Sequence, residues 1–189
     1  MASNLFLVLG GTRSGKSDFA EELAASKGEK ILYIATAACL DEEMERRVKK
    51  HRANRPDKWD TIEEQLKVID VIKHNAVNYD AILLDCLTLF ISNMMYSRSI
   101  DDYGQLEQEI LQKIAQLAEQ AEECCCPVVI VSSEVGLGLV PDNSLGRLYR
   151  DILGKANQIL AAKSKKAYLV VAGIPISLKD LQQKLKEGI

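Results

Sequence analysis

The sequence predicts an α/β fold in which helices flank a mostly parallel central sheet. Two patterns support this prediction: short apolar runs alternate with longer segments of helical period, and a glycine-rich segment follows the first apolar run. Such alternation is typical of βα units stacked on a sheet that is covered on both faces. We expect one domain across residues 1–189, because no linker, repeat or low-complexity tract divides the chain.

The strands are expected in five short runs rich in leucine or β-branched residues: Leu5 to Leu9, Lys30 to Ala35, Ala81 to Asp85, Val128 to Ser132 and Ala167 to Ala172. Helical spacing marks five segments between them: Lys16 to Ser26, Glu42 to Ala53, Glu64 to Lys73, Gln105 to Glu123 and Ser144 to Lys163. Asp142 or Asn143 could cap the last of these helices. The segment after Gly173 is expected to be a tail of uncertain structure.

Composition argues against several classes of protein. The chain has 24 Lys+Arg and 27 Asp+Glu, a net charge of −3, which disfavours a nucleic-acid binder that works through bulk positive charge. No apolar run approaches the length that a membrane helix requires, so we expect a soluble, cytoplasmic protein. The five cysteines are an odd number with three in a row, Cys124 to Cys126, and are expected to be reduced thiols.

The glycine-rich segment is Gly10-Gly11-Thr12-Arg13-Ser14-Gly15-Lys16-Ser17, which matches GxxxxGK[ST] in full between an expected strand and an expected helix. Glycines in this pattern let backbone amides face phosphate oxygens, and the N-terminus of the following helix adds positive potential. Lys16 can reach the outer phosphates and Ser17 can hold Mg²⁺. The segment therefore predicts a nucleotide-binding P-loop, but it does not name the reaction.

A P-loop site also requires a carboxylate near the Mg²⁺, commonly at the carboxyl end of a neighbouring strand. Asp85, which closes the run that starts at Ala81, is the best candidate. An aspartate at a strand end can instead cap the helix that follows it. Both interpretations stay open, and the P-loop favours the metal-binding one.

The two histidines have different surroundings. His74 ends a helix-like segment, where a partly exposed histidine needs no functional role. His51 lies in the basic stretch from Arg46 to Pro56, which fits the solvated end of a helix when it is taken alone. Alternatively, the positive cluster gathers phosphates and keeps His51 neutral, so that its imidazole could attack phosphorus. Trp59 and Glu63 follow closely and could contact a base, although packing is the ordinary role of a tryptophan.

Taken together, these residues resemble one enzyme family, the bifunctional adenosylcobinamide kinase / adenosylcobinamide-phosphate guanylyltransferases of cobalamin biosynthesis. The resemblance spans nearly the whole chain, and its motifs beyond the P-loop stand in order: Tyr33-Ile34-Ala35-Thr36-Ala37, Asp41-Glu42-Glu43-Met44 with Arg47, His51-Arg52, Arg55-Pro56 with Trp59, Thr61 and Glu63, Leu83-Leu84-Asp85-Cys86-Leu87-Thr88, Ser133 to Pro141, Arg147 with Arg150-Asp151, Asn157-Gln158, and Val170 to Pro175. A P-loop alone is generic. Its combination with the segments around His51 and from Glu134 to Pro141 is highly specific.

The resemblance implies two reactions. ATP or GTP would first phosphorylate the hydroxyl on the aminopropanol arm of adenosylcobinamide. GMP from GTP would then be transferred to that phosphate through a guanylylated histidine, giving adenosylcobinamide-GDP and releasing pyrophosphate. Because GMP passes first to the histidine and then to the substrate, two anionic phosphates are not brought together directly.

The resemblance also assigns roles to individual residues. The family's guanylylated histidine corresponds to His51, and its nucleotide contacts correspond to Gly10 to Ser17, Ala35, Thr36 and Ala37, Arg52, Ala53, Asn54 and Arg55, Glu63, and Asp85. Ser17 and Asp85 would hold Mg²⁺. The family fold is RecA-like, and we expect a homotrimer in which a neighbouring subunit completes the corrinoid site.

Two positions depart from the family pattern. The metal carboxylate, Glu or Asp in relatives, is Asp85 here, and its shorter reach leaves direct contact with Mg²⁺ in doubt. Some relatives carry a second histidine beside the nucleophile, where this chain has Lys50. A lysine there raises the local positive potential, but it cannot replace an imidazole nucleophile.

Two further features have alternative explanations. The segment from Glu134 to Pro141 fits either a glycine-rich turn between strand and helix or a loop that lines a corrinoid or nucleotide. Arg147 and Arg150 could bind a substrate phosphate or could simply be solvated. We assign neither feature a catalytic role.

Two other functions remain as alternatives. The first is a P-loop small-molecule kinase without guanylyltransferase activity, in which His51 belongs only to a basic face. The second is a regulatory or assembly protein in which nucleotide binding acts as a switch. Incubation with α-phosphate-labelled GTP distinguishes the first alternative, because only the leading hypothesis predicts label on the protein. The second alternative predicts that adenosylcobinamide is not phosphorylated.

Overall fold

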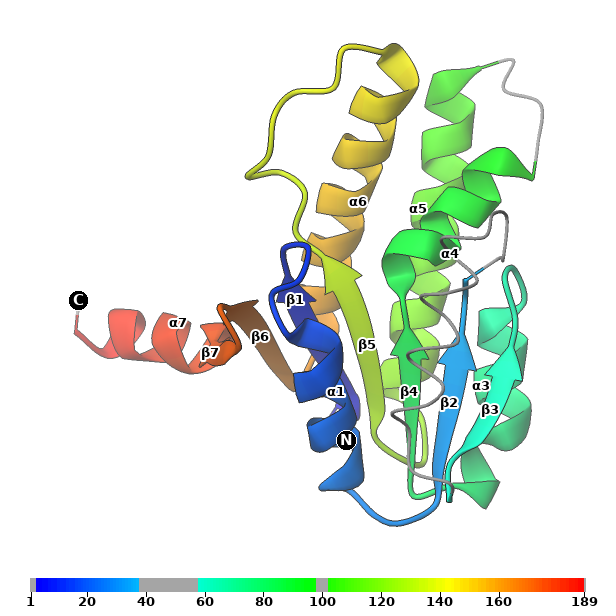
Figure 1. Ribbon diagram of the computed structural model, residues 1–189, viewed down its shortest axis with the longest axis vertical. Coiled ribbons are helices and arrows are strands. Elements are labelled where there is room, and N and C mark those ends of the chain that lie inside the picture. The colour runs from blue at the N-terminus through cyan, green and yellow to red at the C-terminus, as the bar shows by residue number, and fades with distance from the viewer. Residues whose placement is uncertain (1–2, 38–57, 98–101, 189) are drawn as a thin grey trace.

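A computed structural model describes residues 3–37, 58–97 and 102–188. In these ranges the chain forms one sheet of seven strands in the order β3-β2-β4-β5-β1-β6-β7 (Figure 1). The strands are β1 (Leu5–Gly10), β2 (Ile31–Ala35), β3 (Asp60–Glu63), β4 (Ala81–Asp85), β5 (Val128–Ser133), β6 (Lys166–Val171) and β7 (Ile174–Ser177). Neighbouring strands are parallel except β6 and β7, which pair antiparallel.

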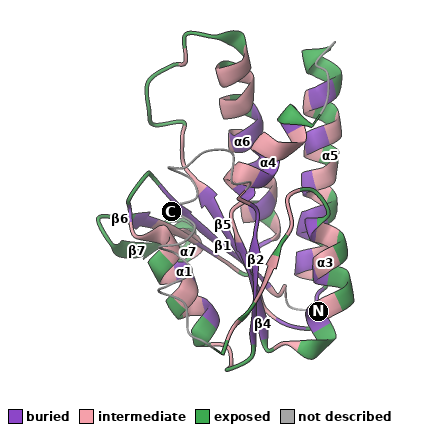
Figure 2. Cartoon of the chain, turned by 45° about the vertical axis from the view of Figure 1, so that its right-hand side comes forward, coloured by how far each residue is buried: buried purple, intermediate pink, exposed green. Residues whose placement is uncertain are grey.

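Helices cover both faces of the sheet (Figure 1). They are α1 (Lys16–Ala25), α3 (Val68–Asn75), α4 (Leu87–Tyr96), α5 (Tyr103–Glu122), α6 (Ser144–Lys163) and α7 (Leu178–Glu187), with a 3₁₀ turn, η1, at Ala76–Asn78. Helices α3 to α6 pack on one face and α1 packs on the other. Helix α7 extends away from the sheet edge beyond β7 and has no buried residue (Figures 1 and 2).

The core divides into two clusters because side chains alternate along each strand. In β1, Leu5 and Leu7 face the cluster under α3 to α6, whereas Phe6 and Val8 face the cluster under α1. Every residue of β1 and β2 is buried, so these strands lack the polar alternation of a half-exposed sheet (Figure 2). The buried strands hold the P-loop and the candidate metal carboxylate on a rigid frame.

The sequence correctly predicted the five strands β1, β2, β4, β5 and β6 and the helices α1, α5 and α6. Helix α3 was expected from Glu64 but begins at Val68. Of the two proposed caps of α6, the structure selects Asn143, whose side chain accepts from the Gly146 amide at 2.6 Å. The helix expected over Glu42 to Ala53 lies outside the described residues.

Five described elements were not predicted: β3, η1, α4, β7 and α7. The segment after Gly173, expected as a tail of uncertain structure, forms the last two of these. Strand β3 is short, partly polar and half-exposed, so it has no apolar run to reveal it. Strand β7 contains Pro175, which is tolerated at this sheet edge but disguises a strand in the sequence. Helix α4 begins only two residues after β4, and its apolar residues merge with the strand in the sequence.

No helix in the described ranges has both the length and the apolar character needed to cross a membrane.

Candidate active site

The P-loop connects the end of β1 to the start of α1, as expected. Gly15, the residue before α1, has φ 88°, a left-handed conformation that favours glycine. Arg13 is also left-handed, at φ 58°. The Lys16 amine donates to the Gly11 carbonyl oxygen at 3.1 Å, so its side chain folds back over the loop. Backbone amides at the start of α1 and this amine form an anion-binding surface.

The turn between β6 and β7 supports the P-loop from one side. The Gly173 amide donates to the Ser14 carbonyl oxygen at 2.8 Å. A Cβ on Gly15 would lie only 3.1 Å from the Gly173 Cα, and a Cβ on Gly10 would meet the Ser14 hydroxyl oxygen at 2.3 Å. These glycines therefore permit close backbone packing. Within the described residues the buried Ser14 hydroxyl has no hydrogen-bond partner.

Asp85 lies at the same edge of the sheet as the P-loop. Strand β5 separates β1 from β4, so about two strand spacings, roughly 10 Å, lie between the ends of β1 and β4. The Tyr33 hydroxyl donates to Asp85 Oδ2 at 2.8 Å and orients the carboxylate. The alternative role as a helix cap is not supported, because the residue before α4 is Cys86 and no side chain caps this helix. A carboxylate and the Ser17 hydroxyl are hard oxygen ligands of the kind that suit Mg²⁺.

Electrostatics link Lys16 to the end of β4. Burial and the neighbouring Asp85 carboxylate raise the pKa of the Cys86 thiol to about 11, while the Lys16 amine opposes this rise. The thiol therefore stays neutral near pH 7 and is a poor nucleophile. Among the described residues no group of three or more His, Cys, Asp or Glu side chains is placed to hold a metal ion. In a P-loop site, phosphate oxygens and water supply most of the Mg²⁺ ligands.

The ends of β2 and β3 bring further predicted residues beside Asp85. Ala35 pairs with Asp85 on one side and with Glu63 on the other. Thr36 is fully buried, and its hydroxyl bonds to the backbone oxygen and nitrogen of Cys86 at 2.7 and 2.8 Å. The side chain of Thr36 thus joins the β2 and β4 ends, and a nucleotide contact here would use other atoms.

A buried polar network at the end of β5 was not anticipated from the sequence. Ser132 donates to Asn157 Oδ1 at 2.6 Å, and Asn157 Nδ2 donates to the Ser133 carbonyl oxygen at 3.1 Å. The Ser133 amide in turn donates to the Thr88 hydroxyl at 2.9 Å. The network fixes α4 and α6 to the strand that runs beside Gly10. Its only sequence signal is a polar Asn157 among apolar residues at helical spacing.

The loop from Glu134 to Pro141 starts at the P-loop edge. The Glu134 amide donates to the Gly10 carbonyl oxygen at 3.0 Å, and the Glu134 carboxylate accepts from the Gly136 amide at 2.8 Å. At its far end, Arg147 donates to the carbonyl oxygens of Pro141 and Asp142 at 3.0 and 2.7 Å. Arg147 therefore closes this loop, and its role toward substrate phosphate stays a prediction, as does that of Arg150.

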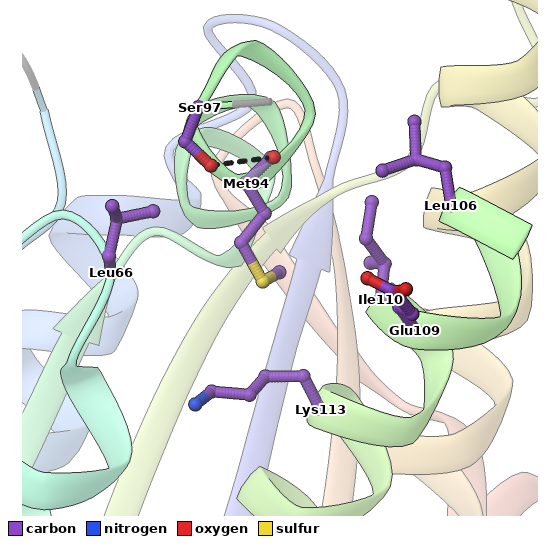
Figure 3. A pocket seen from close by; sticks show the side chains of 7 residues that line it. All are labelled: Leu66, Met94, Ser97, Leu106, Glu109, Ile110 and Lys113. Carbon is purple, nitrogen blue, oxygen red and sulfur yellow. Dashed lines mark hydrogen bonds between the residues drawn. The ribbon is translucent and has the colours of Figure 1, made fainter. Parts of the chain in front are cut away.

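A small cavity of about 220 Å³ lies between the end of α4, α5 and Leu66, which precedes α3 (Figure 3). It contains none of the predicted site residues, and its lining is mainly apolar: Leu66, Met94, Ser97, Leu106, Glu109, Ile110 and Lys113. The proposed nucleophile His51 and the neighbouring Arg52, Ala53, Asn54 and Arg55 lie outside the described residues.

Comparison with known proteins decides the family. The family model for cobinamide kinase / cobinamide phosphate guanyltransferase matches residues 6–178. The chain belongs to this family. It is 40% identical over 182 residues to the bifunctional adenosylcobalamin biosynthesis protein CobU of Escherichia coli K12, covering 93% of this chain and 99% of that protein.

Other relatives agree with this assignment to the cobinamide kinase / guanyltransferase family. The bifunctional adenosylcobalamin biosynthesis protein CobP of Pseudomonas aeruginosa is 40% identical over 92% of this chain and 96% of its own length. The solved structure of an ATPase from a bacterial type III secretion system is similar at a TM-score of 0.59 and 12% identity, covering 93% of this chain and 57% of that one. The predicted α/β, RecA-like P-loop fold and the expected enzyme family of cobalamin biosynthesis are confirmed.

Proposed function

We propose that this chain phosphorylates the aminopropanol hydroxyl of adenosylcobinamide with ATP or GTP, and then transfers GMP from GTP to the new phosphate. Membership of the family over nearly the whole chain supports both reactions. The observation that carries the kinase step is the P-loop at the end of β1, with Asp85 two strands away at the same sheet edge.

In the kinase step, the helix α1 amides and the Lys16 amine would hold the β- and γ-phosphates. Ser17 and Asp85 would hold Mg²⁺, which supplies charge neutralisation on the phosphates when it is bound. The corrinoid hydroxyl attacks the γ-phosphorus, loses its proton to water or a nearby base, and releases the nucleoside diphosphate. Lys16 offsets the negative charge that develops on the transferred phosphoryl group.

In the guanylyl-transfer step, a neutral His51 imidazole nitrogen attacks the α-phosphorus of GTP and pyrophosphate leaves. The product is a phosphoramidate bond between His51 and GMP. A phosphate oxygen of adenosylcobinamide-phosphate then attacks the same phosphorus, and the P–N bond breaks to regenerate the histidine. The basic residues around His51 would favour its neutral form and attract the triphosphate.

The remaining sites follow from the family correspondence. Ala35, Thr36, Ala37, Arg52, Ala53, Asn54, Arg55, Glu63 and Asp85 would contact nucleotide together with the P-loop. The adjacency of Ala35, Glu63 and Asp85 across three strands supports this grouping. A homotrimer and a cytoplasmic location stay predictions.

A product assay tests the two reactions together. With adenosylcobinamide, ATP and Mg²⁺, chromatography should give adenosylcobinamide-phosphate, and added GTP should convert it to adenosylcobinamide-GDP. Lys16→Ala should lower the phosphorylation rate about a hundredfold, because it removes a cation from the transition state. Lys73→Ala, at an exposed lysine on α3, is the matched control and should keep the wild-type rate. Absence of any phosphorylated corrinoid would refute the kinase activity. Adenosylcobinamide-phosphate that accumulates and is not converted to adenosylcobinamide-GDP when GTP is added would support a kinase without guanylyl transfer.

A further inference from the structure

A second cavity, of about 660 Å³, lies between α4 and the first turns of α6. The described residues that line it include none with a charge and combine apolar, aromatic and polar side chains: Ser92, Met95, Tyr96, Asn143, Ser144, Leu145, Gly146 and Tyr149. This volume lies within the range of ligand pockets, and the mixture of apolar body and few polar groups is typical of small-molecule sites. None of these residues belongs to the proposed nucleotide site.

Both walls of this cavity originate at the P-loop edge of the sheet. Helix α4 starts directly after Asp85 and Cys86, and at a rise of about 1.5 Å per residue it places Tyr96 about 14 Å beyond Leu87. The other wall follows the loop that begins at Glu134, whose amide bonds to Gly10. In Figure 1 this loop rises from the end of β5 to the top of α6. A ligand in the cavity could therefore extend a flexible arm toward the phosphates.

The connecting loop and the cavity wall expose large apolar groups. Leu137, Leu139 and Val140 are 87%, 96% and 62% exposed, and Tyr96 is 74% exposed. Scattered apolar residues on a surface are ordinary, and of these four only Tyr96 lines the cavity, while the other three belong to the loop that leads to α6. A nucleotide is disfavoured on this surface, because no cation among the described residues lines the cavity to meet its phosphates.

Hydrogen bonds hold the cavity walls in place. The Tyr149 hydroxyl donates to the Thr88 carbonyl oxygen at 3.2 Å, and burial raises the pKa of Tyr149, so the phenol stays protonated. Thr88 also accepts from the Ser133 amide. The site is thus largely preformed and fixed to the sheet edge that holds the P-loop, which lowers the entropy cost of binding.

We propose that this cavity binds the corrin ring of the cobinamide substrate, with the exposed Tyr96 ring packing on one face of the corrin. The inference rests on the proposed function and names the corrinoid subsite of that activity. A corrin ring offers a broad apolar face and neutral carboxamide side chains, which suit tyrosine, methionine and serine. Its aminopropanol arm would reach along α4 toward the γ-phosphate.

Substitution of Tyr96 tests the subsite, because the side chain is exposed and its loss should not unfold the protein. Tyr96→Ala should raise both the Kd for cobinamide in equilibrium dialysis and the KM for adenosylcobinamide about tenfold. The KM for nucleotide, and labelling of the protein by α-phosphate-labelled GTP without corrinoid, should stay within twofold of wild type. Val77→Ala is the matched control, since Val77 is 80% exposed on η1, outside the cavity lining. It should leave every value unchanged.

The outcomes separate the subsite from the activity. Cobinamide binding that weakens in Tyr96→Ala, in a protein that turns over no corrinoid, would support the subsite and refute the proposed function. An active enzyme whose cobinamide Kd and KM are unchanged by Tyr96→Ala would overturn the subsite. Sedimentation velocity on the same variants supplies a further check. If Tyr96→Ala gives a smaller assembly with an unchanged Kd for cobinamide, the surface contacts a second copy of the chain, and the corrin subsite is overturned.

Discussion

Asn157 holds the polar network at the end of β5, and its truncation should be strongly destabilising. Asn157→Ala removes the acceptor of the Ser132 hydroxyl and the donor to the Ser133 carbonyl oxygen. Ser132 is fully buried and Asn157 is only 6% exposed, so water cannot easily replace these bonds. Each buried polar group left without a partner costs about 1–3 kcal/mol, so we expect a loss of about 3 kcal/mol in the free energy of unfolding.

Urea denaturation, followed by far-UV circular dichroism, measures this loss. Gln158→Ala is the matched control, because Gln158 is exposed on the same helix, and it should change stability by less than about 0.5 kcal/mol. Ser132→Ala added to Asn157→Ala should cost little more, since the hydroxyl has already lost its partner. A loss below about 1 kcal/mol for Asn157→Ala, or full additivity of the two substitutions, would contradict the network.

Two predictions concern titrating groups remote from the P-loop. The thiol of Cys126, 3.9 Å from the Cys124 sulfur, and the nearby backbone amides lower the pKa of Cys124 below that of an ordinary thiol. The rate of Cys124 alkylation, followed by mass spectrometry, should therefore reach half its maximum at a lower pH than that of a free thiol, and Cys126→Ala, but not Cys126→Ser, should move this midpoint upward; a midpoint that Cys126→Ala leaves unmoved contradicts the assignment. The Leu66 and Lys67 amides donate to the Glu64 carboxylate at 2.8 Å and lower its pKa. A carboxylate with a lowered pKa stabilises the fold above its ordinary pKa of 4.5, and this stabilisation is lost as the pH falls. Glu64→Gln should therefore lower the free energy of unfolding by about 0.5 kcal/mol at pH 7, and the difference from wild type should vanish in acid. A difference that does not change with pH would refute this role of Glu64.

Local signals were enough to predict the P-loop and the buried strands. The strand before Gly10 is apolar throughout, and the glycine and lysine pattern after it needs no distant residue to be recognised. The position of Asp85 at the P-loop edge of the sheet was also predictable, because it ends an apolar run, while its role toward Mg²⁺ stays a prediction. Its orientation by Tyr33 was not, since the two residues meet only through the pairing of β2 with β4.

Features that depend on contacts between residues far apart in the chain were not predicted from the sequence. The Asn157 bonds join α6 to β5, and the contact from Gly173 to Ser14 joins the last hairpin to the P-loop. Strand β7 shows the same limit, because it exists only as the antiparallel partner of β6 at the sheet edge. Such contacts follow from the arrangement of the strands, which local patterns do not specify.

Guanylyl transfer through His51 is tested most directly by incubating the protein with α-phosphate-labelled GTP and Mg²⁺ in the absence of corrinoid. The wild-type chain should become labelled, acid should release the label because a phosphoramidate is acid-labile, and His51→Ala should take up none. His74→Ala, at the other histidine of the chain, should label normally. Absence of label on the wild-type protein, or label that persists in His51→Ala, would contradict the histidine-linked mechanism.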